Sequence, residues 1–122
     1  MTLLTLVTGG SAGTREAAIA AQLDPAQSAA VILEGLPDGK DVLLSAATSH
    51  LQVVRIAPGC MHCTGNLVMR VTLNRMLRER PPRLYISVAS TEHLDLLREF
   101  LRAPPYDALL TLTDELSCAS GK

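Results

Sequence analysis

The sequence predicts a three-layer α/β fold in which helices flank a mainly parallel sheet. Short apolar runs alternate along the chain with amphipathic patterns of about 10–15 residues, which is the order typical of βαβ units. The first apolar run ends in a glycine-rich loop that leads into a helical pattern. A chain of 122 residues has the length of one domain with its own hydrophobic core. We expect that domain over residues 1–114 and a flexible carboxyl-terminal tail over residues 115–122.

The predicted strands are short runs rich in leucine, valine, isoleucine and alanine. They cover residues 3–7, 29–33, 52–56, 84–88 and 108–112. Residues 42–44 form either a weak strand or a single helical turn. With almost no aromatic residues in the chain, the core that these strands build must consist of aliphatic side chains.

The predicted helices lie between the strands and end at prolines, because proline disfavours helical backbone at the residue before it. They cover residues 14–23, 66–79 and about 91–103, and the prolines that end them are Pro25, Pro81-Pro82 and Pro104-Pro105. Asn66 is the expected cap of the second helix, and Ser90 or Thr91 caps the third. The apolar stripes of these two helices should face the core: Leu73, Met76 and Leu77 on one, Leu94, Leu97 and Leu101 on the other.

The composition argues against several classes of function. One Phe, two Tyr and no Trp leave few platforms for stacking single-stranded nucleic acid, and a net charge of -1 does not attract polyanions. No apolar stretch approaches the roughly 20 residues that a membrane span needs, and residues 3–7 lack the basic flank of a secretory signal. We therefore expect a cytoplasmic protein that binds neither nucleic acid nor membrane, with its three cysteines reduced unless they hold a metal.

The loop after the first strand occupies the place of a phosphate-binding loop, which reads G-x-x-x-x-G-K-[ST]. Here Gly9 to Gly13 is one residue short, Thr14 stands where lysine belongs, and Arg15 stands where serine or threonine belongs. Any remaining nucleotide contacts would come from Gly10, Ser11, Gly13, Thr14 and Arg15. A turn that needs glycine for its backbone angles explains the loop better than nucleotide hydrolysis does. No catalytic residue is expected.

Residues 58–67 carry two thiols and one imidazole close together: Cys60, His62 and Cys63. All three are transition-metal ligands, and a C-x-x-C spacing lets one loop deliver two sulfurs to one ion. Zinc accepts this mixture of sulfur and nitrogen in a small tetrahedral site. Its fourth ligand would be Cys118, a water or a group from a partner chain. Loops that follow parallel strands emerge at the same sheet edge, so we expect Cys118 and the cysteine loop at the carboxyl edge.

Two other interpretations of the cysteine loop stay open. Small apolar thiols also fill tight loops without any ligand. A C-x-H-C segment before a helix is also the layout of an oxidising dithiol, in which the helix dipole and the histidine lower a thiol pKa. Cys63 lies three residues before the expected cap at Asn66, and no thioredoxin-like aromatic residue precedes Cys60. We therefore rank redox chemistry below metal binding.

Taken in order, these segments resemble the CobW family of P-loop GTPases, which are associated with metal insertion and metal homeostasis. Val31–Gly35 corresponds to the family's V-I-x-N-E-F-G segment, and Gly59–Thr64 to its G-C-I-C-C-T motif. Residues 83–90 stand where the family has a strand ending in E-T-x-G, and residues 110–114 where it has a strand ending in V-V-D. The resemblance implies a CobW-like domain over 1–114, similar to a P-loop NTPase but truncated.

The chain departs from that family in the segments that carry out GTP binding and hydrolysis. The glycine loop lacks its lysine, and Ser87 and Ser90 replace the Glu and Gly of E-T-x-G. Only the cysteine motif is well retained, with His62 in place of the middle cysteine. The resemblance thus implies a non-hydrolysing, GTPase-like domain that binds zinc and serves a protein partner in metal handling. Residual nucleotide binding remains an alternative, as does an interaction module whose uncovered sheet edge pairs two copies into a homodimer.

Overall fold

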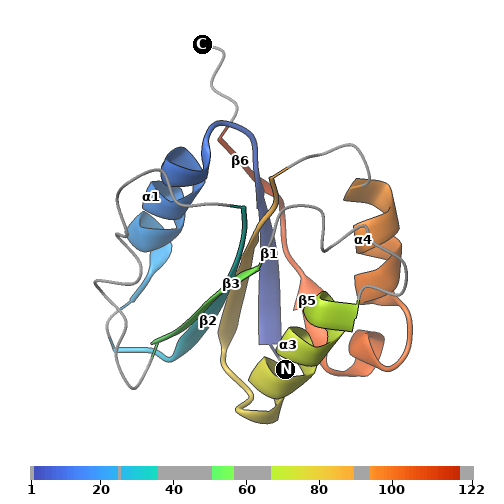
Figure 1. Ribbon diagram of the computed structural model, residues 1–122. Coiled ribbons are helices and arrows are strands. Elements are labelled where there is room, and N and C mark those ends of the chain that lie inside the picture. Colours follow the sequence, from blue (N-terminus) through green and yellow to red (C-terminus); the bar gives the residue numbers. More distant parts are fainter. Residues whose placement is uncertain (1, 25, 36–50, 57–66, 90–93, 119–122) are drawn as a thin grey trace.

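The computed structural model describes residues 2–24, 26–35, 51–56, 67–89 and 94–118. Their strands form one sheet in the order β3-β2-β4-β1-β5, and β6 also pairs with β1 (Figure 1). The strands are β1 Thr2–Thr8, β2 Ala29–Glu34, β3 Leu51–Ile56, β4 Arg83–Ser87, β5 Leu110–Leu112 and β6 Leu116–Ser117. Every pairing between these described strands is parallel, which confirms the predicted sheet.

The helices lie on both faces of this sheet and make it the middle of three layers (Figure 1). They are α1 Ala12–Gln22, α3 Leu67–Arg78 and α4 Leu94–Arg102, followed by a short 3-10 turn at Tyr106–Ala108. α1 covers one face, and α3 and α4 cover the other. The three-layer prediction is therefore confirmed. None of the described helices is long and apolar enough to cross a membrane.

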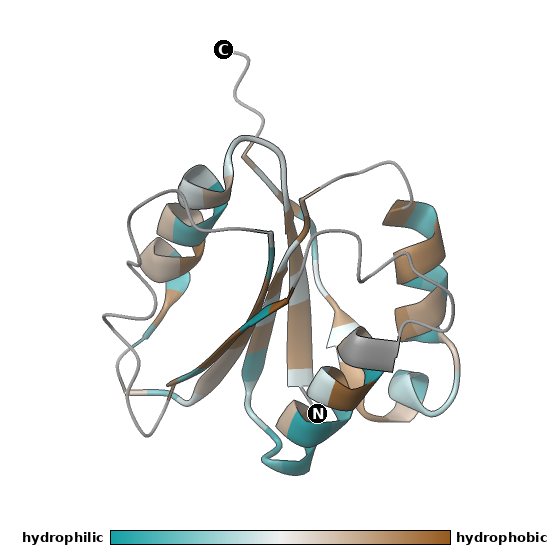
Figure 2. Cartoon of the chain, viewed as in Figure 1, coloured by the Kyte–Doolittle hydropathy of each residue, from teal (hydrophilic) through white to brown (hydrophobic). Residues whose placement is uncertain are grey.

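The core has two parts because successive side chains of a strand point to opposite faces. The larger part joins β-strand residues such as Leu4 and Ile86 to the apolar stripes of α3 and α4, which are buried as predicted. The smaller part lies under α1, where Ile19 packs with Val31 and Leu33. Figure 2 shows the resulting concentration of hydrophobic residues along the strands between the layers.

The end of the described chain differs from the expected tail over 115–122. The two-residue strand β6 pairs with Val7 and Thr8 of β1, past the residues of β1 that pair with β5. The backbone N–H of Cys118 then donates to the Thr8 carbonyl at 2.6 Å. The Glu115 carboxylate accepts from the Thr8 hydroxyl at 2.7 Å and pairs with Arg98 of α4. These contacts reach as far as Cys118, because the carboxyl half of β1 offers backbone groups that need partners.

Other differences are smaller. β5 begins at Leu110, two residues later than predicted, because the 3-10 turn takes up the preceding residues. The predicted element at 42–44 lies outside the described residues. The same holds for the expected caps at Asn66 and at Ser90 or Thr91.

Candidate functional site

The glycine loop connects β1 to α1 at the carboxyl edge of the sheet. Gly9 and Gly10 have φ angles of 82° and 63°, which other residues rarely adopt, so both positions require glycine. Ser11 is extended and caps the helix, because its hydroxyl accepts from the backbone N–H of Thr14 at 3.1 Å. The helix therefore begins two residues earlier than predicted, and Gly13 lies in its first turn. Serine is a common cap, so this signal was present in the sequence.

The side chain of Arg15 is buried behind this loop, with 4% of its surface exposed. Its Nε donates to the Ser87 hydroxyl of β4 at 2.7 Å. Its Nη1 donates to the carbonyl of Gly10 at 2.9 Å and to that of Gly9 at 3.3 Å. One guanidinium thus holds the first turn of α1, the glycine loop and the end of β4 together.

The loop does not carry the side chains of a triphosphate site. A phosphate-binding loop adds a lysine to its backbone N–H groups, whereas here Thr14 stands in the lysine position and Arg15 donates to the carbonyls of Gly9 and Gly10. The loop is also closely packed: a Cβ at Gly10 would lie 3.1 Å from the Thr14 side chain and 3.3 Å from the Cys118 carbonyl oxygen. The cationic side chain nearest the loop is therefore used to hold the protein together.

A second buried charge lies next to Arg15 on α1. Glu16 is 1% exposed, and its Oε2 accepts from Nη2 of Arg55 at 3.1 Å. Arg55, near the end of β3, also donates through Nη1 to the Gly35 carbonyl at 3.1 Å. The other oxygen of Glu16, Oε1, is buried and has no hydrogen-bond partner among the described residues. This ion pair ties α1 to the carboxyl ends of β2 and β3.

Glu34 adds a third connection at the same edge. It is the last residue of β2, it is buried, and its Oε1 accepts from the backbone N–H of Ala89 at 2.8 Å. We call the five side chains that join the strand ends and α1 the edge network: Arg15, Glu16, Glu34, Arg55 and Ser87. It contains two cationic and two anionic side chains.

Most of this network was not predicted from the sequence. Arg15 was expected only as a nucleotide contact, and no role was predicted for Glu34 or Arg55. The available signal was a charged residue within or at the end of an apolar strand, since a buried charge requires a partner.

The predicted metal ligands fall in two places. Cys60, His62 and Cys63 lie outside the described residues, in the segment that follows β3. Cys118 is described: it is partly buried against the apolar cluster under α1, at the carboxyl edge where it was predicted. Among the residues that the structure describes, no group of three or more His, Cys, Asp or Glu is arranged to hold a metal ion.

The sheet order separates Cys118 from the end of β3, the strand that precedes the cysteine motif in the sequence. β3 and β6 are four strand positions apart, since β2, β4 and β1 lie between them. At about 4.8 Å for each position, the ends of these strands are about 19 Å apart. The edge network occupies the carboxyl ends of the strands between them.

Replacing Arg15 tests how strongly its guanidinium holds the loop. In an Arg15→Met variant the carbonyls of Gly9 and Gly10 and the Ser87 hydroxyl lose a buried donor. We expect the free energy of unfolding to fall by about 2–3 kcal/mol, measured by urea denaturation. Arg75→Met on the exposed surface of α3 removes the same charge and should change it by less than about 0.5 kcal/mol. Equal effects of the two substitutions would contradict this role.

The Glu16–Arg55 pair calls for a double-mutant cycle. Arg55→Met leaves the Glu16 carboxylate buried without its cation, which should cost about 3 kcal/mol of unfolding free energy. Adding Glu16→Leu removes the stranded charge, so the double variant should recover most of that loss in the same urea titration. A double variant as unstable as the sum of the two single variants would show that the charges do not stabilise one another.

Comparison with known proteins gives one informative similarity. The chain is 34% identical over 117 residues to the zinc chaperone YeiR of Escherichia coli. The match covers 92% of this chain and 35% of YeiR, so the chain spans about a third of its relative's length. No family model and no solved structure matches the chain. Because the match covers nearly the whole chain, it includes the cysteine motif, and it supports a relation to the CobW family.

Proposed function

We propose that this chain is a CobW-type protein that handles zinc as cargo and does not hydrolyse nucleotide. The observation that carries the proposal is the similarity to a zinc chaperone, which extends across the cysteine motif. Cys60 and Cys63 supply two thiolates, and His62 supplies a third ligand. The protein acts in the cytoplasm, where reduced thiols are available to the metal.

The close spacing of the three ligands in the sequence favours cargo handling over a closed structural site. Three ligands from one short loop leave a fourth position open on tetrahedral zinc, to be filled by a water or by a group of a protein partner. Cys118 is a less favourable fourth ligand, because the ends of β3 and β6 are about 19 Å apart. An open position allows a receiving protein to displace the water and take over the ion.

The edge network supports the absence of nucleotide chemistry. Arg15 is the cation nearest the glycine loop, and its guanidinium donates to Ser87, Gly9 and Gly10. Thr14 in the lysine position bonds its hydroxyl to Ser11 at 3.0 Å, which closes the first turn of the helix. With no lysine for the phosphates and with Arg15 in place of the magnesium-binding hydroxyl, the loop stabilises the fold instead.

Zinc binding is the direct test. The reduced, purified chain is titrated with zinc in competition with a chromophoric chelator, and we expect about one tightly bound ion per chain. The double substitution Cys60→Ser/Cys63→Ser should abolish binding, because His62 alone cannot hold the ion tightly. His62→Ala should weaken it by about ten- to a hundredfold.

The matched control is Cys118→Ser, which removes a thiol outside the motif and should leave the affinity unchanged. Equal loss in Cys118→Ser and in the double variant would place Cys118 in the site after all. If zinc binding is unchanged in the Cys60→Ser/Cys63→Ser variant, the proposal is contradicted.

A further inference from the structure

The sheet face under α1 changes character from one side to the other. Ala29 and Val31 of β2 are in register with Arg83 and Tyr85 of β4, and residues paired in register point to the same face. The next strand, β1, contributes Thr5 beside Tyr85. The face is therefore apolar over β2, whereas Arg83, Tyr85 and Thr5 bring polar groups to it on β4 and β1. Val7, farther along β1, belongs to the apolar cluster under α1. Parallel sheets are normally covered on both faces, so an open polar area of this kind is unusual.

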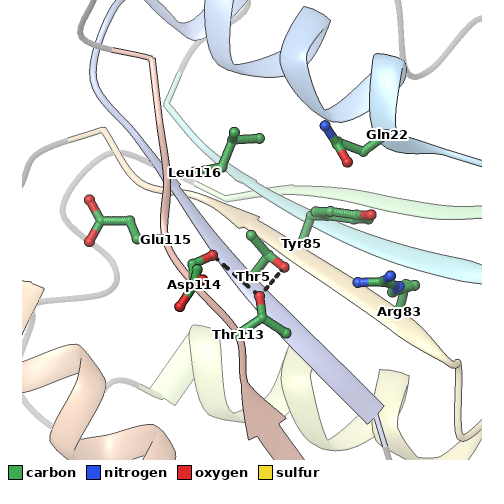
Figure 3. Close-up of a pocket in the computed structure, with 8 residues that line it drawn as sticks. All are labelled: Thr5, Gln22, Arg83, Tyr85, Thr113, Asp114, Glu115 and Leu116. Atoms are coloured by element: carbon green, nitrogen blue, oxygen red, sulfur yellow. Dashed lines mark hydrogen bonds between the residues drawn. The ribbon is translucent and has the colours of Figure 1, made fainter.

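The polar area contains a pocket of about 350 Å³ between α1 and the chain that links β5 to β6. An adjoining hollow of about 250 Å³ shares three of its lining residues, Gln22, Arg83 and Tyr85. Figure 3 shows these three along one side of the pocket, with Thr113 and Asp114 along the other. The hydroxyls of Thr5 and Thr113 are hydrogen-bonded to each other at 2.6 Å between these two sides.

The three shared residues carry hydrogen-bond donors that line both hollows. Tyr85 is 4% exposed, and its ring belongs to the apolar cluster under α1 while its side chain lines both hollows. Gln22 and Arg83 are exposed, so the amide and the guanidinium are open to solvent there. The phenol, the amide and the guanidinium are therefore available to a ligand that enters the pocket.

We propose that this pocket binds the carboxylate group of a small organic acid. The planar fork of Arg83 matches a carboxylate through two parallel N–H···O bonds, and Tyr85 and Gln22 supply further donors. Asp114 and Glu115 also line the pocket, and their charges disfavour a dianion such as phosphate. A volume of about 350 Å³ lies within the range for small-molecule sites, which is about 300–1,000 Å³. None of these donors belongs to the cysteine motif, and carboxylate binding here does not depend on zinc.

Amide chemical shifts of the full chain test the proposal, with the monoanions propionate and butyrate and with inorganic phosphate as probes at constant ionic strength. We expect both carboxylates to shift the amides of Thr5, Gln22 and Tyr85 with millimolar dissociation constants, and phosphate to bind more weakly. Absence of saturable shifts at these residues, or tighter binding of phosphate than of carboxylates, would overturn the assignment.

Substitutions then separate a built site from general charge attraction. Tyr85→Phe keeps the ring and removes only the hydroxyl, so it should weaken propionate binding by about tenfold. Arg83→Gln should weaken it further. Arg78→Gln removes an equal charge from the exposed surface of α3 and should leave the affinity within twofold. Equal losses in Arg83→Gln and Arg78→Gln, or no effect of Tyr85→Phe, would contradict the proposal.

Discussion

The buried guanidinium of Arg15 is the contact on which the carboxyl edge of this sheet depends. A cation removed from water must be satisfied by protein acceptors, and Arg15 finds them in Ser87, Gly9 and Gly10. These acceptors belong to two parts of the edge: Ser87 to the end of β4, and Gly9 and Gly10 to the glycine loop. The conformation of the loop and the position of α1 are therefore set by the same side chain.

The neighbouring pair Glu16–Arg55 extends this arrangement to β2 and β3. The two adjacent residues of α1 thus contact different strands: Arg15 bonds to β4 and Glu16 bonds to β3. In a phosphate-binding fold a nucleotide fills the space above these strand ends. Here the edge network provides the Glu16–Arg55 ion pair in that region, and we propose that this network stabilises the topology without a nucleotide.

The architecture could be predicted from the sequence, whereas the contacts of the edge network could not. Strands such as Leu51–Ile56 and the buried stripe of α4 leave periodic apolar patterns that predict their type and order. β6 has only two residues, which is too short to produce a pattern. The contacts of Arg15 and Glu16 join residues 72 and 39 positions apart, so no local spacing reveals them.

The central claim is that this edge is held together by its own side chains and does not bind a nucleotide. Thermal unfolding of the wild-type chain with and without millimolar GTP and Mg²⁺ tests it most directly. We expect an unchanged midpoint and no release of phosphate, because the loop offers no lysine and its nearest cation is already bonded. A midpoint that rises with GTP concentration, as ligand binding to the folded state requires, would contradict the claim.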